Sequence, residues 1–113
     1  MDINVVVLIG RLSAPPQIST EENTVVRLLV ASRSETPIKR LDLLPVAWWN
    51  PTPDELAQIP EVGARVWVTG SVQRRYWEGR DGRHSRIEVV ATQVTFPTDD
   101  ELTPQGSEAS KTP

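Results

Sequence analysis

Residues 70–90 read GSVQRRYWEGRDGRHSRIEVV, and their pattern decides the fold. Apolar and polar residues alternate on both sides of Asp81-Gly82, and an Asp-Gly pair between two such runs is typical of a β-hairpin turn. The alternation begins upstream and predicts a half-buried strand over residues 64–77. A last strand is expected over residues 86–96. The second half of the chain therefore predicts two long antiparallel strands joined by a tight turn.

The hairpin is rich in arginine and carries two aromatic residues. Its basic side chains outnumber its acidic ones, although the chain as a whole has a formal net charge of −3. Arginine forks hold phosphate in a bidentate manner, and aromatic faces stack on unpaired bases. The alternative is an ordinary solvated hairpin whose arginines keep a sheet edge soluble. The segment alone leaves both interpretations open. The residues concerned are Arg74, Arg75, Tyr76, Trp77, Arg80, Arg83 and Arg86.

Three main strands and one short helix are expected ahead of this hairpin. The strands cover residues 3–12, 25–32 and 43–49. Thr52 fits the N-cap of a helix, and Pro53 fits its first position. Five strands with a short helix between the third and the fourth are the layout of the OB-fold, a five-stranded Greek-key barrel that binds oligonucleotides on one face. The predicted fold class is therefore all-β.

The first strand is apolar on both faces. Five large apolar residues follow one another in it up to Ile9, and the first four are Val5, Val6, Val7 and Leu8. Successive side chains point to opposite sides of a sheet, so both sides need covering, and a small barrel covers only one. A second copy of the chain is the commonest cover, and we expect these four residues at a homo-oligomer interface. The run is too short to span a membrane or to form the core of a signal peptide.

The chain divides into one domain and an acidic tail. Its 113 residues suffice for a single domain with a modest core, which we place at residues 1–97. Residues 98–113 hold the excess of acidic over basic residues and one large apolar residue, Leu102. Such a segment cannot bury enough surface to offset the cost of ordering, so we expect it to be disordered. The absence of cysteine is typical of a reducing compartment and favours a cytoplasmic protein.

Four segments of the chain carry a specific resemblance. They read VVVLIGRL at residues 5–12, LLPVAWW at 43–49, VWVTGSVQRRYWEGRDG at 66–82 and RIEVVATQVTF at 86–96. In this order and spacing they resemble the bacterial single-stranded DNA-binding protein family. The resemblance implies an OB-fold and sequence-tolerant binding of single-stranded DNA by base stacking and phosphate contacts, in DNA replication, recombination or repair. It also implies a homotetramer and a nucleoid-associated location in the cytoplasm.

The resemblance also assigns site residues. Trp77 and Trp49 fall where the family places stacking aromatics on its fourth and third strands. Arg75 stands in the place of a phosphate-contacting residue, and Arg11, near the end of the first strand, faces the groove in the family. Trp48 is then expected in the core or at an interface, because neighbouring residues of a strand point to opposite faces. Further expected DNA contacts are Arg33, Trp67, Arg74, Tyr76, Arg80, Arg83 and Arg86.

Several departures from the family pattern predict weaker binding. Residues 34–42 make a shorter excursion than the family's long hairpin and lack its aromatic residue. Leu43 stands where many relatives have Trp or Phe. Basic positions of the family are filled by Pro45, Pro51 and Val62. Each lost stack is worth about 1–3 kcal/mol, so two losses weaken binding by several decades unless other residues compensate.

The tail departs from the family as well. The best-known bacterial members end in a very acidic run with an apolar Pro-Phe tip, which docks repair and replication proteins. This chain ends EASKTP at residues 108–113. Partners that dock on such a tip are therefore not implied for it.

No enzyme, metal or cofactor is indicated. The sequence has no Gly-rich phosphate loop, no nucleophile near a plausible base and no acidic cluster typical of a two-metal site. His84 has no second histidine, no cysteine and no regular carboxylate spacing beside it. Three functions stay open: binding of single-stranded DNA, an oligomeric OB-fold interaction module with little DNA affinity, and binding of single-stranded RNA. Stacking and phosphate contacts do not distinguish the two nucleic acids well.

Overall fold

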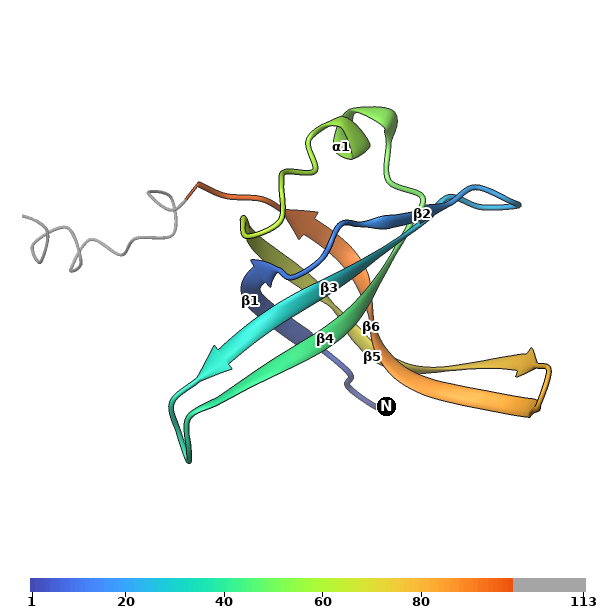
Figure 1. The fold of residues 1–113 in the computed structure, drawn as a ribbon, viewed down its shortest axis with the longest axis horizontal. Helices are drawn as coiled ribbons and strands as arrows, with labels where there is room; N and C mark the ends of the chain where they lie inside the picture. Colours follow the sequence, from blue (N-terminus) through green and yellow to red (C-terminus); the bar gives the residue numbers. More distant parts are fainter. Residues whose placement is uncertain (99–113) are drawn as a thin grey trace, which may run out of the picture.

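The computed structural model describes residues 1–98 of the chain, which contain six strands and one short helix (Figure 1). The elements are β1 (Val6–Leu12), β2 (Gln17–Ser19), β3 (Val25–Ser34), β4 (Arg40–Trp49), α1 (Pro53–Ala57), β5 (Arg65–Gly79) and β6 (Gly82–Thr95). None of the described residues belongs to a helix that would span a bilayer. The tail that is predicted to be disordered lies, from residue 99 on, outside the described residues.

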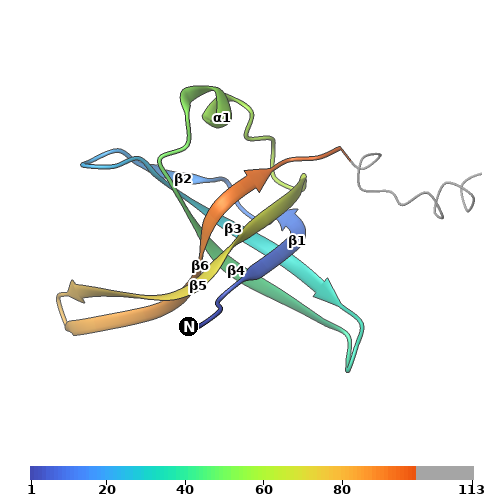
Figure 2. The same ribbon diagram turned by 180° about the vertical axis from the view of Figure 1, so that it is seen from behind.

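Five of the strands close into a barrel. The order in the sheet is β1-β5-β6-β4-β3-β2. Because β1 also pairs with β3 at Arg11 and Leu12, the strands β1, β5, β6, β4 and β3 form a closed ring. Among the described strands only β4 and β6 run parallel, over residues 46–48. This is the strand arrangement of the OB-fold, so the predicted fold is confirmed. Figure 2 shows the barrel from behind, with α1 over one of its ends.

The pleat of the strands decides which side chains fill the barrel. Every second residue of β3, from Val26 to Val30, points inward, and Trp48 of β4 follows the same rule. Trp48 is 5% exposed, and its ring centroid lies 6.2 Å from that of Phe96. Trp49, which is 48% exposed, points outward. The predicted parity of the Trp pair is thus confirmed.

Two glycines allow strands to pass one another closely. A side chain at Gly10 would collide with the backbone of Ala31, and one at Gly70 would collide with the backbone of Val90. The register between β5 and β6 also shifts at Thr69/Gly70. The extra residue is Thr92 of β6, and a bulge of this kind bends the strand that carries it.

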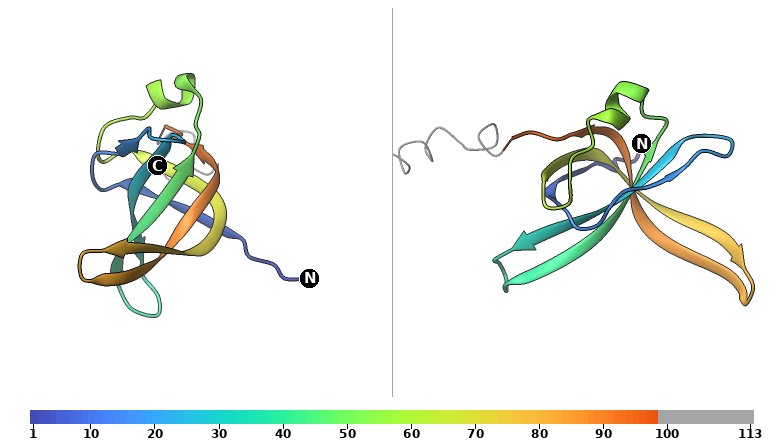
Figure 3. Two further views of the ribbon diagram at one scale, coloured as in Figure 1. Left: turned by 90° about the vertical axis from the view of Figure 1, so that its right-hand side faces the viewer. Right: turned by 45° about the horizontal axis from the view of Figure 1, so that its top comes forward.

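Two hairpins extend beyond the barrel as separate arms, one made of β3 and β4 and the other of β5 and β6 (Figure 3). In the second arm Gly79 pairs with Gly82, so Arg80 and Asp81 form the tip, one residue earlier than predicted. Gly82 has a φ of 115°, a conformation that glycine adopts without strain.

Both arms are longer than predicted. β3 continues to Ser34 and β4 begins at Arg40, because these two residues still pair in register. β6 begins at Gly82 instead of Arg86, since its pairing with β5 continues to the turn. Polar and charged residues carry the pairing in these segments, so hydrophobic alternation did not reveal it.

The first strand begins later than predicted, at Val6. Ahead of it, Asn4 donates from Nδ2 to the carbonyl oxygen of Val72 (2.7 Å) and accepts at Oδ1 from the N–H of Val72 (2.9 Å), so a side chain takes the place of a backbone pairing. Within β1 the alternation places Leu8 in the core and Val7 outside. Leu8 is therefore not available to an interface on the outer face, which corrects the prediction for this residue. Val6 is half-buried against the core.

The helix starts where predicted. The N–H of Glu55 donates to Oγ1 of Thr52 (3.1 Å), and the N–H of Thr52 donates to Oε1 of Glu55 (2.7 Å). These reciprocal bonds form a capping box, with Pro53 in the first turn. A helix of 5 residues is too short to be stable alone, so its cap and its attachment to the barrel hold it in place.

Replacement of Trp48 by alanine should cost the barrel much of its stability. The side chain is large and buried, so its removal opens a cavity, and we expect the free energy of unfolding to fall by about 3–5 kcal/mol. Trp49→Ala is the matched control, because this neighbour lies outside, and a change of about 1 kcal/mol or less is expected. Urea denaturation followed by circular dichroism measures both. Equal losses in the two variants would contradict the assigned parity.

Candidate nucleic-acid interface

The outward sides of β3, β4, β5 and β6 form one surface that collects cations and aromatic rings. Val90 of β6 pairs with Ala47 of β4 and with Ser71 of β5, and these three residues point outward. Every second residue from them along each strand points outward as well. We name it the arginine–tryptophan surface. Its members are Arg27 and Arg33 from β3, Leu41, Leu43 and Trp49 from β4, Arg75 and Trp77 from β5, and His84, Arg86 and Glu88 from β6.

Trp77 is an exposed ring with two close neighbours. It is 37% exposed, and His84 lies directly opposite it on β6. The two rings stack with their centroids 5.4 Å apart and their planes at 19°. Two residues earlier on the same face of β5, Arg75 places its Cζ 4.4 Å from the centroid of the indole. These contacts hold the indole in one orientation, so a base that stacks on it meets a ring that is already ordered.

A buried carboxylate lies at the base of this arrangement. Glu88 is 5% exposed and accepts a hydrogen bond from Nη1 of Arg27 at Oε2 (3.1 Å). Its Oε1 lies 3.0 Å from Nε of Arg75, an ion pair without hydrogen-bond geometry. Sequence reasoning missed both Glu88 and Arg27. The available signal was a lone acid among the apolar residues of the last strand.

The outward positions of β4 form an apolar row. Leu41, Leu43 and Trp49 point away from the core, and each is about half exposed. Asn50 ends the strand with a φ of 52°, and its Oδ1 accepts the N–H of Thr24 (3.1 Å), which fixes the backbone next to Trp49. Leu43 supplies apolar contact surface but no ring, so the expected loss of one stack at this position stays a prediction.

A second group of cations lines a groove where β1 meets β3. This groove of about 310 Å³ is lined by Arg11, Arg33 and Arg65, together with Leu41. Nη1 of Arg11 donates to the carbonyl oxygen of Gly63 (2.9 Å), which orients the guanidinium group. Because Arg33 and Leu41 also belong to the arginine–tryptophan surface, the groove continues that surface. Arg65 was not among the predicted contacts.

The arm of β3 and β4 adds less positive charge than its sequence suggests. Arg33, Lys39 and Arg40 line a groove there. Arg40 donates from Nη2 to Oδ1 of Asp42 (2.8 Å) and from Nε to Oδ2 (3.1 Å). These hydrogen bonds, and then the charge of the carboxylate, raise the pKa of Arg40 above its ordinary value. The positive charge of Arg40 is thus compensated within the arm.

Five of the predicted contacts lie away from the arginine–tryptophan surface, and four of these belong to the arm formed by β5 and β6. Their strand neighbours Arg75, Trp77 and His84 point to that surface. Because successive side chains alternate, the opposite face of the arm formed by β5 and β6 carries Arg74, Tyr76 and Arg83. Nη1 of Arg74 donates to Oγ of Ser85 on that face (3.2 Å). Arg80 lies at the tip of the arm.

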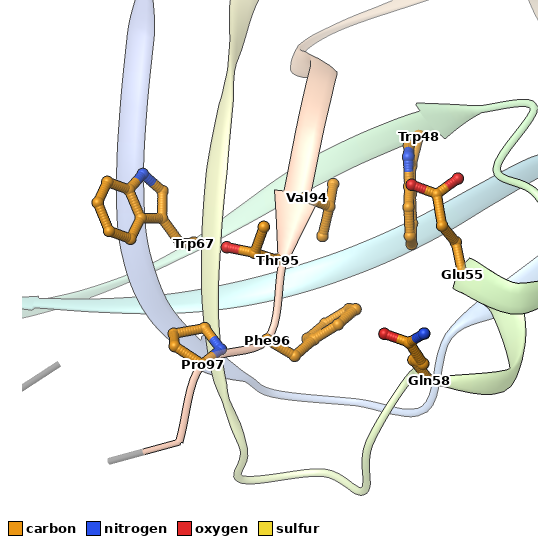
Figure 4. Close-up of a pocket in the computed structure, with 8 residues that line it drawn as sticks. All are labelled: Trp48, Glu55, Gln58, Trp67, Val94, Thr95, Phe96 and Pro97. Carbon is orange, nitrogen blue, oxygen red and sulfur yellow. The ribbon is translucent and has the colours of Figure 1, made fainter. Parts of the chain in front are cut away.

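A cavity of about 550 Å³ lies between α1 and the end of β6 (Figure 4). Trp48 and Phe96 are on its apolar side, and Glu55 reaches it from α1. Trp67, a predicted DNA contact, lies at the other end of the cavity from Trp48 and is paired with Ile9 of β1 on the outer face of the barrel. The residues that line the cavity include a carboxylate and no basic side chain, so it does not fit a phosphate.

The arginine–tryptophan surface therefore offers flat rings and guanidinium groups. Its histidine is engaged within the hairpin, since Nε2 of His84 lies 2.6 Å from Oδ1 of Asp81. Within residues 1–98 no group of three or more potential metal ligands is found. Rings that stack on bases and cations that track the backbone are the combination that binds a flexible single strand.

Comparison with known proteins leads to the same chemistry. A single-stranded DNA-binding protein of Caldanaerobacter subterraneus subsp. tengcongensis is 35% identical over 104 residues, which cover 83% of this chain and 67% of that protein. Single-stranded DNA-binding protein 1 of Clostridium acetobutylicum is 31% identical over 102 residues, which cover 83% of this chain and 93% of that protein.

The fold has a counterpart among solved structures. A structure described as "Plasmodium falciparum SSB complex with ssDNA" superposes with a TM-score of 0.73 at 19% identity, covering 86% of this chain and 97% of the other. The model of the Single-strand binding protein family matches residues 3–97, nearly the whole of the described part. The chain therefore belongs to the single-strand binding protein family.

Proposed function

We propose that this chain binds single-stranded DNA with little regard to sequence, as a binding protein without enzymatic activity. The observation that carries the proposal is Trp77, a partly exposed ring on which His84 stacks, with the Arg75 guanidinium over it and Trp49 on the same surface. The relatives are named as single-stranded DNA-binding proteins, which supports it. The protein serves DNA replication, recombination or repair, and we place it in the cytoplasm with the nucleoid.

Base stacking supplies the sequence-tolerant part of the binding. Every base has a flat face, and each base stacked on an aromatic ring contributes about 1–3 kcal/mol. Trp77 lies on the arm formed by β5 and β6, and Trp49 lies at the end of β4. Leu43 lies on β4 as well and adds apolar contact without a ring. The rings of Trp49 and Trp77 therefore contribute more to binding than the apolar side chain of Leu43.

Phosphate contacts supply the salt-dependent part. The arginine–tryptophan surface carries Arg27, Arg33, Arg75 and Arg86, and the adjoining groove adds Arg11 and Arg65. Each phosphate that a cation neutralises releases bound counterions from the nucleic acid, so affinity falls as salt rises. Stacking and phosphate contacts together explain how one surface accepts any sequence.

Self-association is the second part of the proposal, and it involves the outer face of β1. Val5 and Val7 are 67% and 60% exposed, and Ile9 and Trp67 beside them are also exposed. In the described chain β1 pairs with β3 only at its last two residues, so most of that edge has no partner strand. An apolar face next to an open strand edge favours pairing with a second copy. We therefore propose a homo-oligomer, with a homotetramer as the expected state.

Oligo-dT should quench the intrinsic fluorescence, and Trp77→Ala should weaken binding by about 1–3 kcal/mol because it removes a stacking ring. Trp49→Ala should act in the same direction. Tyr76→Ala is the matched control, since it removes the neighbouring aromatic from the opposite face of the arm. Fluorescence titration, with oligo-U run beside oligo-dT, measures these affinities. Absence of binding to oligo-dT at low salt by folded wild-type protein would refute the proposed function, and a clear preference for oligo-U would redirect it to RNA.

Arg86→Ala should reduce the salt dependence of binding. Each phosphate contact on a single strand contributes about 0.7 to the slope of log affinity against log salt, so the slope should fall by about that amount. Arg83→Ala is the matched control, because Arg83 lies on the opposite face of the same arm. Titrations at several salt concentrations give both slopes. A larger decrease for Arg83→Ala than for Arg86→Ala would show that DNA follows the other face.

Val7→Asp should dissociate the homo-oligomer and leave the barrel folded, because this side chain lies outside the core. A charge on each copy of a buried apolar contact disfavours association. Ile38→Asp, an exposed apolar residue in the turn between β3 and β4, is the control and should leave the mass unchanged. Light scattering measures the mass of each variant. A monomeric wild type at micromolar concentration would contradict the proposed interface.

A further inference from the structure

An acidic residue is buried within the surface that we propose binds a polyanion. Glu88 is the acidic member of the arginine–tryptophan surface, and its side chain is 4% exposed. A carboxylate in this place repels phosphate, and its burial costs free energy unless cations and hydrogen bonds compensate it. Attraction to DNA therefore does not account for Glu88.

The contacts of Glu88 point to a different role. Its Oε2 is 3.1 Å from Nη1 of Arg27, and its Oε1 is 3.0 Å from Nε of Arg75. β4 lies between β3 and β6 in the sheet, so Arg27 reaches over β4 to make this contact. One carboxylate thus ties cations from both sides of the surface. Since the contact engages Nε of Arg75, the terminal nitrogens of that fork suit an acceptor outside the protein, such as a phosphate.

Arg75 connects Glu88 to the stacking ring. Its Cζ lies 4.4 Å from the centroid of the Trp77 indole. Arg75 also lies directly opposite Arg86 on β6, and like charges in this position repel each other. Glu88 follows Arg86 on the same face of β6 and offsets that repulsion. Without the carboxylate, this repulsion favours movement of Arg75 away from its place over the ring.

We infer that Glu88 is a positioning residue of the binding surface: it holds Arg75 over the indole of Trp77 and thereby keeps this ring in the one orientation in which a base stacks on its exposed part. Glu88 itself does not contact the DNA. It acts through Arg75 and prepares the surface before DNA arrives. The inference rests on the proposed function and adds to it a residue whose charge has the sign of the ligand.

Glu88→Gln separates positioning from charge. Glutamine has nearly the shape of glutamate but removes one negative charge from the surface. If Glu88 acted only as a repulsive charge, the variant would bind oligo-dT more tightly and with a steeper salt dependence. If it positions Arg75, the variant binds more weakly despite the added positive charge, by about tenfold, which is at the lower end of the loss expected for one stacked base.

Two controls make the comparison specific. Glu78→Gln produces the same change of charge on the same arm, but Glu78 is exposed on the opposite face, so its removal should leave binding unchanged or slightly tighter. The second control repeats Glu88→Gln in a Trp77→Ala background. Because the inferred role depends on the ring, the weakening should disappear there. A purely structural role would give the same weakening in both backgrounds.

Weaker binding by Glu88→Gln that depends on Trp77 supports the inference. Behaviour like that of Glu78→Gln, or an equal loss with and without Trp77, overturns it. Circular dichroism and thermal melting show whether each variant is folded. Should Glu88→Gln fail to fold, Glu88→Asp keeps the charge, withdraws it from Arg75 by one carbon and is judged by the same two criteria. Failure of the wild type to bind oligo-dT is a separate outcome, which refutes the proposed function and not only the role of Glu88.

Discussion

A closed barrel of five strands has a single interior, and each side chain of its strands points either into that interior or away from it. Trp48 fills part of the core, so Trp49 has to lie outside. The same alternation runs unbroken along β5 from Val68 in the core, and it places Trp77 on the outward side of the arm. A slip of one residue would turn Trp77 to the opposite face and bring Tyr76 to the surface in its place. The extra residue at the register shift, Thr92 of β6, in turn places His84 and Arg86 on the same side of the arm as Trp77.

The arrangement of charge follows from this geometry. Alternation brings Arg75 and Arg86 opposite each other at the base of the arm, and Arg27 reaches the same place from β3. Cations packed this closely repel one another in the absence of ligand, and the repulsion would disorder the surface that they form. Glu88 lowers that repulsion from within. A surface for a polyanion can thus contain a buried anion, because its cations must share a small area before the ligand is bound.

The fold was predictable because its signals are local. Alternating apolar residues, the Asp-Gly pair and the Thr52 cap lie within short segments, and each indicated its element. The arms extended further than predicted because charged residues continue the pairing without hydrophobic alternation. The contact between Arg27 and Glu88 joins residues 61 positions apart, so no local pattern reveals it. Whether Arg86 and Glu88 share a face with Arg75 depends on one extra residue of β6, Thr92, and a single extra residue leaves little mark on a sequence pattern.

The barrel separates assembly from binding. The apolar face around Val7 lies on β1 and the first part of β5, whereas the arginine–tryptophan surface lies on β3, β4, β6 and the last part of β5. β5 contributes to both, and the irregularity at Thr69/Gly70 divides its two parts. A second copy docked on β1 would therefore leave Trp49 and Trp77 open. In the proposed homo-oligomer, linked copies would bind one strand at a high effective concentration, and assembly would then offset the ring that Leu43 does not supply. Under the proposed assembly, a weakened single site and an uncovered apolar face would be two parts of one solution, because joining several barrels would restore the affinity that one barrel lacks.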